Sequence, residues 1–97
     1  MEPTPDIRAA LRQALPALRA RFGIRTLRLF GSHLRGDARP DSDLDLLVEF
    51  DRTPDLFAFV ALRDHLSEAL GLPVDLATPA SLDARLAPHI LQEAEAL

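Results

Sequence analysis

The chain has 97 residues, a mass of 10.7 kDa and a net charge of −4, values that fit one globular domain. With 47% apolar and 27% charged residues, the composition excludes a disordered tail, a fibrous chain and a membrane-embedded protein. There is no cysteine, which excludes disulfides and thiolate metal sites.

Charge and the amino-terminal residues restrict the partners and the compartment. The net negative charge, with a pI near 5.2, argues against stable nucleic-acid binding and suits a basic protein partner better. The amino terminus lacks the basic start and apolar run of a signal peptide, and no stretch approaches about 18 apolar residues. We therefore predict a cytoplasmic protein without membrane association.

The first predicted elements are a helix and a strand. Apolar residues recur every three or four positions from Asp6 to Phe22, which is typical of an amphipathic helix, and Gly23 is suited to end it. Pro16 lies inside this pattern, so we expect a kink or two helical segments. The β-prone run 26–30 predicts the first strand.

A turn, a loop and the second strand follow. Gly31 and Ser32 are suited to a tight turn that opens a helix. Residues 33–42 contain a glycine and a proline, which predicts one helical turn followed by a loop. In the strand predicted over 43–50, alternation separates an apolar face from Asp43 and Asp45. The apolar face consists of Leu44, Leu46, Val48 and Phe50.

The next predicted elements are a long helix and a third strand. Thr53 and Pro54 supply a helix N-cap and a proline at the first helical position, and Gly71 is placed to end that helix. The third strand covers 74–76 and again has a single carboxylate, Asp75, facing away from its apolar residues.

A short helical region completes the chain. Thr78 and Pro79 repeat the cap-and-proline start, Pro88 interrupts the pattern, and the residues after it form a final helical stretch or an edge strand. The order αβ(α)βαβα predicts a single α/β (α+β) domain over 1–97, with a small mixed sheet flanked by helices. The helix between strands two and three makes that pair parallel.

One group of residues has a spacing that points to a functional site. A Gly-Ser turn is followed, after ten residues, by Asp43 and Asp45 on one strand and then by Asp75 on the next. Residues two apart on a strand point the same way, with α-carbons roughly 6.6 Å apart, so their carboxylates can share cations. Each feature alone is ordinarily a helix cap or a solvated strand face, whereas their joint spacing indicates a site.

The stretch Gly31-Ser-His-Leu-Arg-Gly-Asp-Ala-Arg-Pro-Asp-Ser-Asp-Leu-Asp-Leu46 resembles the signature of the minimal nucleotidyltransferases, relatives of DNA polymerase beta. The resemblance extends through 73–76 and more loosely to 90–94, so it spans most of the chain. It implies a polymerase beta-like nucleotidyltransferase fold and the transfer of a nucleotide from ATP to an acceptor.

The resemblance also implies roles for single residues. Asp43, Asp45 and Asp75 would be the catalytic residues and would hold two Mg²⁺ ions, which bridge the phosphates, activate the attacking oxygen and steady the departing pyrophosphate. Gly31 and Ser32 would bind the triphosphate, since glycine allows close approach to the backbone and the hydroxyl donates a hydrogen bond.

Further phosphate ligands and non-catalytic residues are also predicted. Arg35 and Ser42 are predicted to contact phosphate, with Arg39 ranked below Arg35. A second group is expected to be solvated or structural, and it comprises Asp37, Asp41, Glu49, His33, His65 and His89. A third group is expected to lie in the core, and it comprises Leu27, Leu29 and the region 57–59.

Small chains with this signature resemble the antitoxin of a bacterial pair whose toxin is a HEPN-domain ribonuclease. The resemblance implies transfer of AMP from ATP to a toxin tyrosine, which neutralises the toxin. The chain itself contains no tyrosine, so the target would lie on the partner. Two alternatives stay open: a catalytically idle antitoxin that acts by binding alone, and a nucleotidyltransferase that modifies a small molecule.

Overall fold

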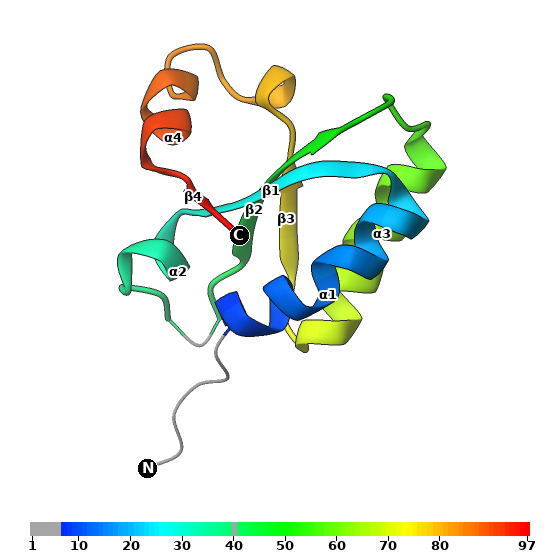
Figure 1. Cartoon of the computed structure of the whole chain (residues 1–97). Helices are drawn as coiled ribbons and strands as arrows, with labels where there is room; N and C mark the ends of the chain where they lie inside the picture. Colours follow the sequence, from blue (N-terminus) through cyan, green and yellow to red (C-terminus); the bar gives the residue numbers. More distant parts are fainter. Residues whose placement is uncertain (1–6, 40) are drawn as a thin grey trace.

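The computed structural model describes residues 7–39 and 41–97 (Figure 1). Asp6, the expected first residue of the first helix, and Pro40 of the predicted loop lie outside these ranges. In chain order the elements are α1 (Ile7–Phe22), β1 (Ile24–Phe30), α2 (Ser32–Arg35), β2 (Leu44–Phe50), α3 (Leu56–Leu70), β3 (Val74–Ala77), the 3₁₀ helix η1 (Pro79–Ser81), α4 (Ala87–Glu93) and β4 (Glu95–Ala96).

The strands form one mixed sheet in the order β3-β2-β1-β4. β2 and β3 are parallel and connected through α3, as predicted, whereas β1 pairs antiparallel with both β2 and β4. The parallel register aligns Asp45 with Asp75. The edge-strand alternative for the last residues is therefore confirmed, and the predicted mixed α/β architecture is present.

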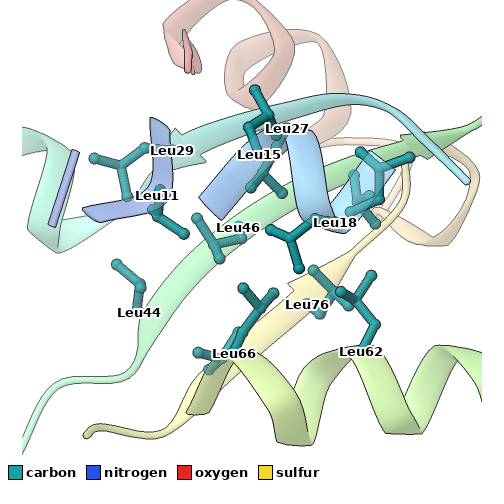
Figure 2. Close-up of a cluster of buried hydrophobic side chains, with 13 residues drawn as sticks. Leu11, Leu15, Leu18, Leu27, Leu29, Leu44, Leu46, Leu62, Leu66 and Leu76 are labelled. Atoms are coloured by element: carbon teal, nitrogen blue, oxygen red, sulfur yellow. The ribbon is translucent and has the colours of Figure 1, made fainter. Parts of the chain in front are cut away.

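A single hydrophobic core lies between the sheet and two helices. Figure 2 shows leucines of α1 and α3 packed against the strands. Leu44, Leu46 and Val48 are fully buried, as the alternation of β2 predicts, and Phe50 packs partly buried against the same cluster. Because this face is filled, the side chain of Asp45 must lie on the other face of the sheet.

The opposite face of β2 is not wholly polar. Leu47 is 1% exposed although it shares the side of Asp45, and it stands outside the main core cluster. η1 lies against β2. The segment that follows β3 therefore returns to contact β2, an arrangement that the alternating pattern alone did not indicate.

The predicted start of the long helix is wrong. α3 begins at Leu56, and its N-cap is Asp55, whose carboxylate accepts a 2.7 Å hydrogen bond from the backbone N–H of Ala58. Within the helix Phe59 packs against the core, whereas Phe57 is 85% exposed. The region 57–59 is thus only partly core, because residues two positions apart in a helix point about 200° apart and cannot both face the core.

Two prolines lie within helices. α1 runs unbroken through Pro16, so of the two predicted alternatives the two-segment helix does not apply. Pro88 does not interrupt a helix but lies in the first turn of α4, where a missing N–H leaves no helical hydrogen bond unmade. Thr78 and Pro79 begin η1 as predicted, although it is a single 3₁₀ turn that ends at Ser81. No helix of the described ranges is long and apolar enough to cross a membrane.

Candidate active site

The turn after β1 lies directly against a carboxylate. Gly31 is buried and has φ +80° and ψ −156°, a conformation that is essentially restricted to glycine. A Cβ atom at this position would lie only 2.9 Å from Cγ of Asp45. The Gly-Ser turn and the Asp-x-Asp strand, separated by ten residues in sequence, are therefore in contact, and glycine is required at that contact.

Asp45 is the electrostatic centre of this arrangement. The pKa of Asp45 is raised to about 6, chiefly by burial and then by the charge of Asp75, a hydrogen bond with the side chain of Asp75 and the charge of Asp43, while the charge of His33 lowers it. One of two neighbouring carboxyl groups keeps its proton to a higher pH than usual, because like charges at short distance cannot both ionise without cost. The pKa of Asp45 therefore indicates a concentration of negative charge around this side chain.

The donor set suits a divalent cation. Mg²⁺ prefers carboxylate oxygens, and the mutual repulsion of Asp45 and Asp75 is what a bound cation would relieve. Within residues 7–39 and 41–97, no three His, Asp or Glu side chains are already gathered around one metal position. Asp43 lies just before β2, is exposed and acts on Asp45 through its charge, so it would have to turn toward the other two to share a cation.

The predicted phosphate ligands differ in their present contacts. Ser32 is half-buried, and its carbonyl closes α2 by accepting hydrogen bonds from the N–H groups of Gly36 and Asp37. Ser42 accepts a 2.8 Å hydrogen bond through Oγ from the N–H of Arg39, which braces the loop before β2. Ser32 and Ser42 therefore lie on different segments, and each of these segments borders Asp45.

Arg35 is held by acidic side chains. Its Nη1 lies 3.3 Å from Glu93 of α4, and its Nε lies 3.5 Å from Asp37. The sequence did not point to Glu93, because 58 positions separate it from Arg35 and no local pattern links them. His33, predicted to have no part in the site, acts on Asp45 through its charge, and its Nε2 lies 3.4 Å from the carbonyl oxygen of Ser42.

Glu49 has a structural role, in agreement with its predicted place at the surface. Its carboxylate accepts a 2.8 Å hydrogen bond from the hydroxyl of Thr26 and lies 3.5 Å from Arg28. These contacts fasten β2 to β1 beyond the site. An open groove at this end of β2, lined among others by Phe50, Phe59 and Pro79, shares no residue with the predicted nucleotide site.

The raised pKa of Asp45 predicts an unusual dependence of stability on pH. Between the ordinary pKa of about 4 and the folded value of about 6, the folded state binds more protons than the unfolded state, so stability falls as pH rises. In the absence of divalent cations, we expect Asp45→Asn to raise the free energy of unfolding by about 1 kcal/mol at pH 7, after discounting for solvent screening. At pH 4 the gain should be much smaller.

Thermal unfolding in a chelator at both pH values measures this difference. About 1 kcal/mol corresponds to roughly 4–8 °C in Tm for a domain of this size. Asp41→Asn, on the exposed loop, is the matched control and should leave Tm nearly unchanged. An equal gain for Asp45→Asn at both pH values would contradict the proposed titration.

Comparisons with known proteins agree with this geometry. Residues 11–97 match the family described as nucleotidyltransferase domain. The protein adenylyltransferase MntA of Thermococcus cleftensis is 42% identical over 88 residues, which cover 91% of this chain and 89% of that protein.

Solved structures show the same fold. A structure described as a candidate minimal nucleotidyltransferase has a TM-score of 0.75 and 40% identity, with coverage of 95% of this chain and 94% of the other. A toxin–antitoxin structure with AMP-PNP has a TM-score of 0.68 and 28% identity over 93% of this chain and 68% of the other. The contact of the Gly-Ser turn with Asp45, the register of Asp45 with Asp75 and these similarities together show that the chain belongs to the nucleotidyltransferase domain family.

Proposed function

We propose that this chain is an antitoxin that transfers AMP from ATP to a tyrosine of a cognate HEPN ribonuclease toxin. The observation that carries the proposal is the contact between Gly31 and Asp45, with Asp75 in register beside Asp45. This contact sets a backbone turn suited to phosphate directly against two carboxylates suited to cations. A nucleotide bound at the turn would therefore place its phosphates beside the carboxylates.

Each residue of the site would have a distinct part in the reaction. Asp43, Asp45 and Asp75 would hold two Mg²⁺ ions, which supply charge neutralisation on the phosphates and activation of the attacking oxygen. Gly31 would let the triphosphate approach the backbone, and the hydroxyl of Ser32 would donate a hydrogen bond to it.

The acceptor is inferred from the names of the related proteins. The Thermococcus protein is named a protein adenylyltransferase, and a structure of the same fold is a toxin–antitoxin pair with the ATP analogue AMP-PNP. This chain contains no tyrosine, so a tyrosine acceptor would belong to the partner. Addition of AMP places a bulky, charged group near the nuclease site and so neutralises the toxin.

The test is transfer to the partner itself. With purified toxin, ATP and Mg²⁺, intact-mass spectrometry should show the toxin gaining increments of one AMP unit. A toxin that gains no mass, while its ribonuclease activity is still blocked, would favour the idle antitoxin. Addition of AMP to small hydroxyl compounds but never to the toxin would favour the small-molecule enzyme.

Ser32 provides a test of the nucleotide position. Ser32→Ala removes one charge-assisted hydrogen bond to phosphate and should weaken ATP binding by about 1.5–3 kcal/mol, without unfolding the chain. Titration calorimetry with Mg²⁺ and ATP measures this loss. Ser81→Ala, at the exposed end of η1, is the matched control and should bind ATP as the native chain does. Unchanged affinity in folded Ser32→Ala would move the triphosphate away from this turn.

A further inference from the structure

Helix α4 meets the candidate nucleotide site through one ion pair. Nη1 of Arg35 lies 3.3 Å from Oε1 of Glu93, whose other oxygen lies 3.4 Å from Nε2 of His89. Nε of Arg35 is engaged by Asp37 at 3.5 Å. Figure 1 shows α2 and α4 together at the end of the sheet away from α1 and α3. Arg35 is thus the point at which the carboxy-terminal segment touches the predicted phosphate ligands.

Helix α4 is weakly attached, whereas the residues after it are anchored. None of the residues of α4 is buried. β4 pairs with β1 through two residues, and Leu97 packs against the core and donates a backbone hydrogen bond to the carbonyl of Leu27. In the described ranges, two ion pairs join residues 87–97 to the rest of the chain: Arg35 with Glu93, and Arg8 with Glu95. A change at one of these pairs should therefore alter how firmly α4 is held.

We propose that the Arg35–Glu93 pair is an exchangeable latch, opened when the triphosphate of a nucleotide takes Arg35 from Glu93. The proposal rests on the proposed function, since it assumes that Arg35 binds phosphate. Two of the three guanidinium nitrogens already contact carboxylates, so a phosphate that binds at Nη1 competes with Glu93 for this nitrogen.

The exchange is energetically feasible. The side chain of Arg35 is 52% exposed, and ion pairs of such exposure contribute only about 0–1 kcal/mol. A triphosphate offers several negative charges and bidentate geometry, so it competes well against one carboxylate. Once Arg35 has left Glu93 for the triphosphate, α4 has fewer contacts and is free to move.

Coupling of this kind works in both directions. If nucleotide binding releases α4, then a protein that holds α4 away from α2 must strengthen nucleotide binding by the same factor. Leu86 and Leu91, at the start and within α4, are 56% and 38% exposed and are available for such a contact. The partner could thereby regulate the occupancy of the site that modifies it.

The first test measures nucleotide affinity. Glu93→Gln keeps the shape of the side chain but removes the competing charge, so it should tighten AMP-PNP binding by about 2–5-fold at low salt in the presence of Mg²⁺. Glu95→Gln makes the same charge change two residues later and breaks the pair with Arg8 instead. As the matched control it should alter affinity by less than about 2-fold. Equal tightening by both variants, or weaker binding by Glu93→Gln, would overturn the latch.

The second test follows α4 itself by amide hydrogen exchange. AMP-PNP with Mg²⁺ should increase exchange in 87–93 of the native chain. In Glu93→Gln, exchange there should already be high without nucleotide and should not rise further. When Arg35→Gln is already present, adding Glu93→Gln should no longer change the affinity, because the charge of Glu93 acts through Arg35.

The outcomes separate the latch from the proposed function. A native chain that binds no AMP-PNP would contradict the nucleotide site and the latch together. A native chain that binds AMP-PNP, with exchange in α4 unchanged by nucleotide and by Glu93→Gln, would overturn the latch alone and leave the transferase function standing.

Discussion

Replacement of Asp43 and Asp45 by asparagine should stop AMP transfer while leaving the complex with the toxin intact. The substitution keeps the size of both side chains but removes two charges from the proposed cation site. Cation placement contributes several kcal/mol to stabilisation of the transition state, and each 1.4 kcal/mol or so changes the rate tenfold. We therefore expect the transfer rate to fall by more than about 1,000-fold.

Measurement of transfer and binding on the same samples makes this result decisive. Intact-mass spectrometry reports AMP on the toxin, and size-exclusion chromatography reports the complex. Asp41→Asn with Asp64→Asn is the matched control, because it removes two exposed carboxylates outside the site. Transfer at the native rate by the Asp43/Asp45 variant would exclude these residues from the reaction, whereas loss of the complex would show that they serve the interface.

Those parts of the fold that rest on alternation or on helical spacing could be predicted from the sequence. The apolar positions of β2 determine which face is buried, and α3 between two strands determines the parallel pairing of β2 with β3. Together these two features set Asp45 beside Asp75. The geometry of the carboxylate pair is thus encoded in local patterns of the chain.

Contacts that depend on distant residues could not be predicted in this way. Glu93 reaches Arg35 only because β4 pairs with β1 and so returns α4 to the site. Leu47 is buried although the alternation of β2 places it on the side of Asp45. Phe57 and Phe59 were expected in the core together, but they lie about 200° apart around α3, so only Phe59 packs against the core.

The second large effect is expected at Gly31, where both the backbone conformation and the space around it demand glycine. The φ of +80° with ψ of −156° is strained for any other residue by about 1–3 kcal/mol. An added methyl group would also overlap Asp45, and overpacking of this kind typically costs a further 1–3 kcal/mol or so. Gly31→Ala should therefore lower stability by about 2–6 kcal/mol, or Tm by roughly 10 °C or more, and should abolish transfer by displacing Asp45.

Two comparisons separate the contact with Asp45 from backbone strain. Gly36 also has a positive φ, +82°, but an added Cβ there would meet nothing within 4 Å, so Gly36→Ala should lose only about 1 kcal/mol. If Gly31→Ala is destabilising mainly because its methyl group meets Asp45, then Asp45→Ala should add about 1–3 kcal/mol more stability in the Gly31→Ala background than it does in the native chain. Chemical denaturation of the four proteins of this cycle gives the coupling energy directly. Additive effects of the two substitutions would mean that the turn and the carboxylate are independent. This result would contradict the contact on which the proposed site depends.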